Sequence, residues 1–578
     1  MYYTSKEVYE SISKQRNDPI VEWKTCSVSG TEFPIYQSDL ELYDKISPTF
    51  NGVKYTISMP TLCPECRQKR RLAFRNERKL YRRTCDASGK QIISIYSPDK
   101  PYKIYDQKIW RSDSRDPMDY GRDFDFSKPF FQQFSEMLQS IPLFSLSIFS
   151  SEDCDYTNAT DGCKSCYMSF NIMQSSNLYY SAAAYATHNS CDVDYSPEKW
   201  ENLYQCVDVV NCYNSKYLLY CNDCYNSEFL YNCHGCMDCI MCYNLDNKQY
   251  HIENVAYTPE EYQKKKEEMK SHYTRAFFLE FIKSAIRKDC NIINSENVIG
   301  NNIFNSQNIS QGFSVYNSQN CKYCQNVIWL QDSADCIEAW LESYGLYECH
   351  GTSGVKNAIS INQGYYNSRV YYIYSCYYSS DLFACIGLRN KQYCIFNKQY
   401  TKEEYETLVP KIIEHMQKTG ERWEFFPASI SPFGYNETIA MEYFPLSKAE
   451  ALKQWYKRMD QEYPINIPEN AQTIQAKNLP NNIQEITDDI LNKVILCEES
   501  GRPFRIIKAE LDFYRKHNLP LPRRHPDIRH LERINLRHPR KLFDRICDKC
   551  GKKIRTTYAP ERPEKVYCEF CYQKEIYG

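Results

Sequence analysis

Apolar residues between Asn211 and Leu245 recur with a period of three. Small or apolar residues stand at every third position, and the residues between them are mostly Asn, Asp, Tyr and Lys. These ladder positions are Cys212, Ser215, Leu218, Cys221, Cys224, Ser227, Leu230, Cys233, Cys236, Cys239, Cys242 and Leu245. A helix repeats at about 3.6 residues and a flat strand at about 2. The pattern instead predicts a narrow β-solenoid of about twelve residues per coil, with small side chains inside.

A second stretch has the same period, so the sequence predicts two tandem solenoids. Its ladder runs from Ile303 to Ala339 and resumes from Cys376 to Leu388. The first solenoid begins near Cys154, and its phase slips around residues 192–202, where we predict a loop. Both stretches close with the tetrapeptide Asn-Lys-Gln-Tyr, followed by a Thr N-cap with Glu three residues on. This capping box indicates that a helix starts after each solenoid.

The two ends of the chain are copies of one module. Cys-x-x-Ser-Gly-x-x-Phe-x-Ile begins at both Cys26 and Cys497, and residues 85–90 align with residues 547–552. The sequence predicts six regions in this order: an N-terminal zinc-binding module with a basic helix (1–150), a first solenoid (151–257), a helical connector (258–288), a second solenoid (289–400), a helical and irregular linker (401–490) and a C-terminal zinc-ribbon module (491–578). The fold class is therefore mainly β with α segments, with treble-clef-like modules flanking the solenoids.

The strongest chemical motif is the pair of knuckles Cys547-x-x-Cys550 and Cys568-x-x-Cys571. Two Cys-x-x-Cys pairs separated by a hairpin supply the four thiolates of a structural zinc site. Gly551 permits the tight turn. We predict zinc here.

The N-terminal copy is less complete. Cys63 and Cys66 form one knuckle, whereas Ser29 and Ser88 stand where Cys26 and Cys85 would need a second cysteine. We predict that Cys26, Cys63, Cys66 and Cys85 form one zinc site; the alternative is a decayed site. The C-terminal copy has His525 and Ile528 in place of Cys63 and Cys66.

A basic segment follows each knuckle position. Because the net charge of the chain is only −2, these segments are local patches. The arginines predicted to bind nucleic acid are Arg67, Arg70, Arg71, Arg75, Arg78, Arg82, Arg529, Arg533, Arg537 and Arg540. Arginine grips phosphates through bidentate hydrogen bonds. The alternative is a helix face that pairs with acidic groups, including those of the protein's own solenoid.

Twenty of the 29 cysteines lie between Cys154 and Cys394. They allow a metal store, a disulfide stack or plain packing. Packing is favoured because Ser, Leu, Ile and Val occupy equivalent ladder positions, and free Cys packs as a small hydrophobe. The tripeptides Cys233-His234-Gly235 and Cys349-His350-Gly351 indicate coil corners, with a Cys/His metal or nucleophile site as the alternative.

The N-terminus lacks the apolar core of a signal peptide, and no apolar run is long enough to span a bilayer. We therefore expect a soluble cytoplasmic protein with reduced thiols and no membrane partner. Aromatic residues at 15% argue against disorder. The motifs of nucleotide-binding loops and common hydrolases are missing.

The coil spacing resembles that of insect antifreeze β-helices, which also place Cys, Ser and Ala inward at every third residue. This resemblance implies coil geometry only, since Asn and Tyr stand here in place of their outward Thr array. Most of the chain also resembles a family of uncharacterised bacterial proteins with zinc-ribbon-like ends, through the segment from Cys63 to Arg67, the Asn-Lys-Gln-Tyr repeats and residues 431–438. That resemblance implies no activity.

The expected function is a non-enzymatic zinc-binding scaffold that binds nucleic acid or a ribonucleoprotein through its basic zinc modules. The alternatives are a scaffold for protein partners without nucleic acid and, less favoured, an enzyme with a cleft between the solenoids. No catalytic residue is assigned.

Overall fold

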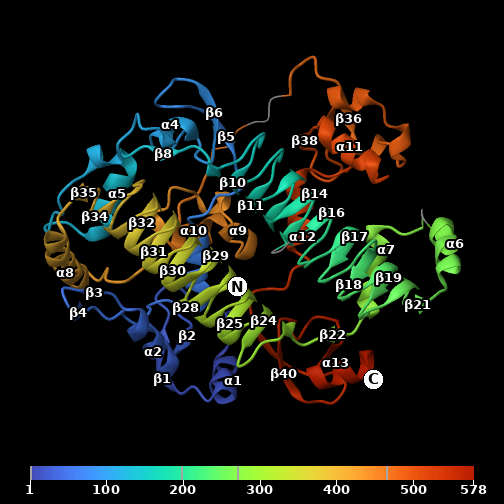
Figure 1. The fold of residues 1–578 in the computed structure, drawn as a ribbon, viewed down its shortest axis with the longest axis horizontal. Coiled ribbons are helices and arrows are strands. Elements are labelled where there is room, and N and C mark those ends of the chain that lie inside the picture. Colours follow the sequence, from blue (N-terminus) through green and yellow to red (C-terminus); the bar gives the residue numbers. More distant parts are fainter. Residues whose placement is uncertain (1–2, 197–199, 270–271, 462, 464–466) are drawn as a thin grey trace. The chain divides into compact units, whose positions relative to one another are not determined.

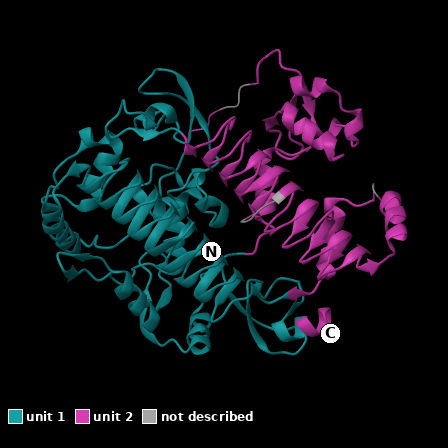
Figure 2. Ribbon diagram, in the orientation of Figure 1, with its two compact units in different colours: residues 1–145, 288–459, 539–572 teal, residues 146–287, 460–538, 573–578 magenta. Residues whose placement is uncertain are grey.

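The computed structural model describes residues 3–196, 200–269, 272–461, 463 and 467–578. The chain forms two compact units, each built from segments that are not consecutive (Figure 2). Unit 1 comprises Met1–Ser145, Lys288–Met459 and Pro539–Tyr572. Unit 2 comprises Leu146–Arg287, Asp460–His538 and Gln573–Gly578. The N-terminal module thus belongs with the second solenoid, and much of the C-terminal module belongs with the first.

The first solenoid lies in unit 2 and is built from short parallel strands (Figure 1). Its strands are β9 (Ile148–Phe149), β10 (Asn158–Asp161), β11 (Phe170–Met173), β12 (Ser176–Tyr179), β13 (Ala182–Tyr185), β14 (Thr187–Cys191), β15 (Asp194–Ser196), β16 (Trp200–Tyr204), β17 (Tyr213–Leu219), β18 (Glu228–Tyr231), β19 (Met237–Tyr243) and β20 (Gln249–Ile252). Leu218 pairs with Leu230, and Leu230 pairs with Cys242. This register confirms a coil of twelve residues.

The second solenoid lies in unit 1 and repeats this architecture. Its strands are β23 (Ile292–Ile293), β24 (Ile299–Phe304), β25 (Gln307–Tyr316), β26 (Gln319–Lys322), β27 (Gln325–Ile328), β28 (Leu330–Ala334), β29 (Ile337–Trp340), β30 (Ser343–Ser353), β31 (Lys356–Tyr365), β32 (Ser368–Tyr377), β33 (Ser380–Phe383) and β34 (Gln392–Ile395). Each solenoid ends in a short antiparallel strand, β21 (Val255–Ala256) and β35 (Lys398–Gln399).

The predicted ladder forms the interior of both solenoids. Cys221, Cys224 and Leu230 have no exposed surface, and the equivalent residues of the second solenoid are buried in the same way. The second ladder does not stop at Ala339, as the sequence pattern indicated. It continues through Leu346 and Cys349 to Val370, because one extra residue enters the coil where Leu330 pairs with Ser343.

The phase slip of the first solenoid has the same cause. Thr187 pairs with Trp200, one residue more than a regular coil would give. The loop predicted at residues 192–202 includes residues 197–199, which lie outside the described residues. Strands β15 and β16 lie on either side of them. The solenoid therefore continues past this point, and the one extra residue shifts the inward positions that follow it by one.

The backbone explains why Asn recurs beside the ladder. The residue before an inward position repeatedly takes a left-handed conformation, as at Asn214, Asn226 and Asn232, whose φ angles are 48°, 49° and 50°. Asn tolerates this region better than most residues. The side-chain amide of Asn214 also donates to that of Asn226 at 2.9 Å. Hydrogen bonds between asparagines twelve residues apart therefore join successive coils.

Aromatic residues stack between coils in the same way. The ring centroids of Tyr217 and Phe229 are 4.5 Å apart, and those of Phe304 and Tyr316 are 5.1 Å apart, with nearly parallel planes. Such columns hold neighbouring coils in register.

Inward thiols are packing groups in this tube. No disulfide joins any of the cysteines, all of which lie in the described part of the chain. The Cys221 thiol lies 3.3 Å from the carbonyl of Leu219, and Ser215, on the same ladder, donates to the carbonyl of Tyr213 at 2.9 Å. Serine and cysteine therefore make the same contacts.

We accordingly expect Cys221→Ser to cost about 1 kcal/mol and Cys221→Leu to cost at least about 1–3 kcal/mol, because overpacking strains a filled interior. Hydrogen exchange of β17 and β18 measures both variants. A serine variant as damaging as the leucine variant would show that the thiol has a specific role.

Helices follow each solenoid, as predicted. Thr258 and Glu261 exchange the two hydrogen bonds of a capping box before α6 (Pro259–Met269), and Thr401 and Glu404 do so before α8 (Lys402–Lys418). The helical connector predicted at residues 258–288 contains two helices, α6 and α7 (Arg275–Phe281). In the described part of the chain, no helix has the length and apolar character needed to cross a bilayer.

The N-terminal module lies along the second solenoid in unit 1 (Figure 1). Helices α2 (Gln37–Ile46) and α3 (Pro64–Leu72) both contact β30. Other elements of the module are α1 (Lys6–Arg16), β1 (Ile20–Thr25), β2 (Glu32–Tyr36), β5 (Tyr81–Thr84), β6 (Gln91–Ser94), β7 (Ile104–Tyr105), α4 (Gln107–Arg111) and α5 (Phe130–Ser140).

The C-terminal module is shared between the units. In unit 2, β37 (Val494–Leu496), β38 (Pro503–Phe504), α11 (Lys508–Lys516) and α12 (Pro526–Ile534) form its first part, and α12 contacts β15 of the first solenoid. In unit 1, the hairpin of β39 (Phe543–Ile546) and β40 (Lys553–Thr556) precedes β41 (Val566–Tyr567) and the start of α13 (Glu569–Ile576).

Candidate metal centres and arginine helices

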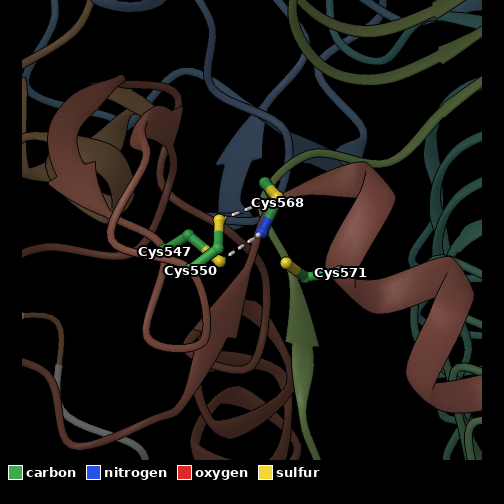
Figure 3. A group of neighbouring side chains, drawn as sticks. All are labelled: Cys547, Cys550, Cys568 and Cys571. Carbon is green, nitrogen blue, oxygen red and sulfur yellow. Dashed lines mark hydrogen bonds between the residues drawn. The ribbon is translucent and has the colours of Figure 1, made fainter.

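Cys547, Cys550, Cys568 and Cys571 converge at the tip of the β39–β40 hairpin and the start of α13 (Figure 3). Their sulfur atoms all lie within 4.8 Å of one another. The Sγ atoms of Cys550 and Cys568 are 3.8 Å apart. A tetrahedron with metal–sulfur bonds of about 2.3 Å has edges of about 3.8 Å. The predicted four-cysteine group therefore has the size of a site for a single metal ion.

The local backbone prepares these thiols to bind a metal. Gly551, at a φ of 72°, closes the knuckle by donating to the carbonyl of Cys547 at 2.9 Å. The amide of Cys568 donates to Cys547 Sγ at 3.3 Å. Burial raises the pKa of Cys547, but amide donors from Cys550, Cys568 and Lys549 outweigh it and lower that pKa to about 6. A metal binds the thiolate, so these donors favour binding.

A second group comprises Cys26, Cys63 and Cys66, whose sulfur atoms also lie within 4.8 Å of one another. Cys26 comes from the turn between β1 and β2, and the other two flank the start of α3. All three are buried. Among the residues that the structure describes, no further cluster of His, Cys, Asp or Glu meets the same distance criterion.

Cys85 does not belong to this group, which corrects the predicted four-cysteine site. It follows β5 in a separate turn, where its sulfur accepts the backbone N–H of Asp106 at 3.2 Å. Asp106 is the N-cap of α4. Cys85 is thus part of its own turn-and-helix unit.

The described part of the chain contains four such units, whereas the sequence repeats indicated only two modules. In each, a cysteine begins a tight turn closed by a left-handed glycine, and a helix later in the chain starts beside that cysteine: α3, α4, α12 and α13 in turn. The four cysteine–glycine pairs are Cys26–Gly30, Cys85–Gly89, Cys497–Gly501 and Cys547–Gly551. In three units the residue at the helix start donates its N–H to the cysteine sulfur: Asp106 to Cys85, His525 to Cys497 and Cys568 to Cys547. The signal was available in the recurring pattern Cys-x-x-(Ser or Cys)-Gly.

The arginines of α3 point into the protein. Arg67 and Arg71 are buried, and both contact the buried carboxylate of Asp335 on the second solenoid, at 2.9 and 3.2 Å. Arg70 pairs with Glu348 at 2.7 Å. Three more arginines were predicted with them. Arg75 pairs with Glu77 and Glu338. Arg78 is half-buried and Arg82 is exposed.

The arginines of α12 repeat this arrangement in unit 2. Arg529 and Arg533 are buried against the carboxylate of Asp192 on the first solenoid, and the Arg533–Asp192 distance is 2.7 Å. Arg533 also contacts Asp194. The third arginine predicted here, Arg537, follows α12 and pairs with Asp208 at 3.0 Å.

The two docking helices are therefore equivalent. Arg67 and Arg529 directly follow the aligned positions Cys66 and Ile528, and the spacing between Asp192 and Asp335 equals that between the two Asn-Lys-Gln-Tyr repeats. Sequence reasoning missed these carboxylates because single aspartates are common beside the ladder.

This placement bears on the predicted nucleic-acid contacts. A phosphate reaching Arg67, Arg71, Arg529 or Arg533 would have to displace a buried carboxylate from each. Arg540, in unit 1, lies over the ring of Tyr443 at 3.8 Å. The observed contacts are instead those of the alternative prediction, in which the basic segments pair with acidic groups of the protein's own solenoids. Nucleic-acid binding stays a prediction without support from the position of these side chains.

The two Cys-His-Gly tripeptides are coil corners. Gly235 and Gly351 have φ angles of 60° and 54°. His350 is buried, its Nδ1 lies 3.2 Å from Asn362 Oδ1, and burial lowers its pKa well below the usual range. Neither histidine joins a metal-sized group among the described residues.

Comparison with family models, curated proteins and solved structures finds no match for this chain.

Proposed function

We propose that this protein is a non-enzymatic scaffold, stabilised by structural zinc, that binds a partner protein in the cytoplasm. The observation that carries the proposal is the use of Arg67, Arg71, Arg529 and Arg533 as internal ties. Each pair of arginines holds a helix of a terminal module against a solenoid. These basic helices therefore have a structural role, because carboxylates of the same unit already neutralise the charge of their buried arginines.

Zinc is the metal that suits the four-cysteine centre. Four thiolates in a compact tetrahedral set are typical of zinc or iron. The turn-and-helix setting, with every position of the tetrahedron supplied by cysteine, is that of a structural zinc site, where no position is left for a substrate. The cytoplasm keeps such thiols reduced.

A protein partner is favoured by apolar residues exposed beside this centre. Phe570, between Cys568 and Cys571, has 75% of its surface exposed, and Ile546, next to Cys547, has 58% exposed. Large apolar side chains held by a rigid metal-bound turn bury well against another protein. Hydrated phosphates would not bury these apolar side chains, so the exposed residues do not favour a nucleic-acid backbone as partner.

Affinity purification of the full chain tests this function. Proteins should be recovered with the wild type after nuclease treatment, and Phe570→Ala should reduce their recovery several-fold while zinc content is unchanged. Tyr378→Ala, which removes an aromatic residue exposed on the solenoid, is the matched control. Recovery of nucleic acid, with loss of all partners on nuclease treatment, would contradict the proposal and favour the nucleic-acid alternative.

A further inference from the structure

The three-cysteine group of the N-terminal module has an oxygen where the C-terminal centre has its fourth sulfur. Ser29 holds the position in its turn that Cys550 holds in the other, since both stand three residues after the first cysteine and directly before the left-handed glycine. Ser29 Oγ lies 3.8 Å from Cys63 Sγ, and Cys550 Sγ lies 3.8 Å from Cys568 Sγ. The two fourth positions are thus equivalent in sequence and in geometry.

The surrounding backbone matches as well. Gly30 donates to the carbonyl of Cys26 at 2.9 Å, as Gly551 does to Cys547. Ser27 donates to the carbonyl of Thr61 at 3.2 Å, as Asp548 does to that of Val566 at 3.0 Å. The turn and the helix start therefore have the relative placement that the complete centre uses. The exchange of sulfur for oxygen at one corner is the main chemical difference between them.

We infer that Cys26, Cys63 and Cys66 hold a second zinc ion, with the Ser29 hydroxyl or a water molecule at the fourth position, and that this ion exchanges faster than the one held by four cysteines. The inference rests on the proposed zinc chemistry and is independent of the proposed partner. A neutral hydroxyl is a weaker zinc ligand than a thiolate, so this corner opens most readily. Ser29 is half-buried whereas the three cysteines are buried, so solvent reaches the ion from the Ser29 side.

Tyr3 is the other oxygen close to the group. Cys66 Sγ lies 3.9 Å from the Tyr3 hydroxyl. Tyr3, however, precedes α1 and lies outside the turn-and-helix unit, whereas Ser29 belongs to the turn itself. Ser29 is therefore the assigned position, and Tyr3→Phe distinguishes the two.

The test uses the full chain loaded with zinc, with metal content measured by mass spectrometry and release followed with a colorimetric chelator. The wild type should hold two ions that leave in a fast and a slow phase. Ser29→Cys should slow the fast phase about tenfold or more, because it completes a four-sulfur set. Cys550→Ser should convert the slow phase into a fast one, and Tyr3→Phe should change neither.

Cobalt supplies an independent readout. The Ser29→Cys variant loaded with Co²⁺ should show stronger sulfur-to-metal charge-transfer absorption than the wild type. If the wild type holds one ion per chain and Cys26→Ser still holds one, the N-terminal site does not exist, and this inference fails while the C-terminal zinc site stands. The inference also fails if Ser29→Cys leaves the rate of the fast phase unchanged. If Cys568→Ser also leaves metal content unaltered, the zinc part of the proposed function fails with it.

Discussion

Replacing Asp335 by asparagine should destabilise unit 1 by about 3 kcal/mol or more. Asp335 is fully buried, and its carboxylate faces Arg67 and Arg71, whose side chains are 1% and 0% exposed. Asparagine keeps the shape of the side chain and tolerates the φ of 58° at this position. The substitution therefore removes one charge, leaving the buried Arg67 without its counter-ion and Arg71 with only the more distant carboxylate of Glu348, at 3.6 Å.

The measurement is hydrogen exchange of α3 and β30, because a protein of two units does not unfold in one step. Arg82→Ala is the matched control: it removes an exposed arginine of the same module and should stay within about 0.5 kcal/mol of the wild type. Asp192→Asn should repeat the effect on α12 and β15 in unit 2. An Asp335→Asn variant as stable as Arg82→Ala would show that the buried pairs do not hold the module to the solenoid.

Local periodicity was sufficient to predict the solenoid. The period of three is set by the backbone itself, since one residue per triplet takes the left-handed conformation and the next points inward, as Asn226 and Ser227 do. The ladder therefore identifies the interior wherever the coil is regular. It fails at Ala339, because one inserted residue moves every later inward position and the sequence does not show that the coil survives.

The role of the arginines could not be predicted in this way. Arg67 and Asp335 are distant in the chain, and no local pattern shows that the N-terminal module belongs with the second solenoid rather than the first. The sequence pattern of a basic helix is the same whether its arginines bind a phosphate or a carboxylate inside the protein. Only the fold distinguishes the two, because it buries Arg67 and Arg71 on a face that sequence patterning treats as solvated.

The cysteine motifs show the same division between local and distant information. Cys547-x-x-Cys550 and Cys568-x-x-Cys571 contain a whole site within one hairpin and one helix start, so spacing alone was enough to predict which residues converge. The N-terminal site was harder to predict, because Cys26 and Cys85 are single cysteines and spacing does not show which of them lies beside the Cys63–Cys66 knuckle. The structure repeats the turn-and-helix unit, so Cys85 stands beside Asp106 and Cys26 beside Cys63.

Loss of metal from the C-terminal centre should unfold the ribbon locally. The apolar core of the ribbon is small and consists of Ile554, Tyr558 and Val566 packed on the cysteines themselves. Structural zinc contributes about 10–16 kcal/mol of apparent binding free energy in zinc-finger peptides. A core of this size cannot replace that contribution. Cys568→Ser should therefore abolish exchange protection in β39, β40 and α13.

The second solenoid, which belongs to the same unit, should keep its protection in this variant, because its coils bury a separate ladder of side chains. Cys85→Ser is the matched control: it removes a buried thiol that lies outside both metal groups, so zinc content and ribbon protection should remain unchanged. Acidification of the wild type should act like Cys568→Ser, because protons compete with the metal for the thiolates and the stabilisation is lost as pH falls. A Cys568→Ser protein that retains its metal and its protected hairpin would contradict a structural role for this centre.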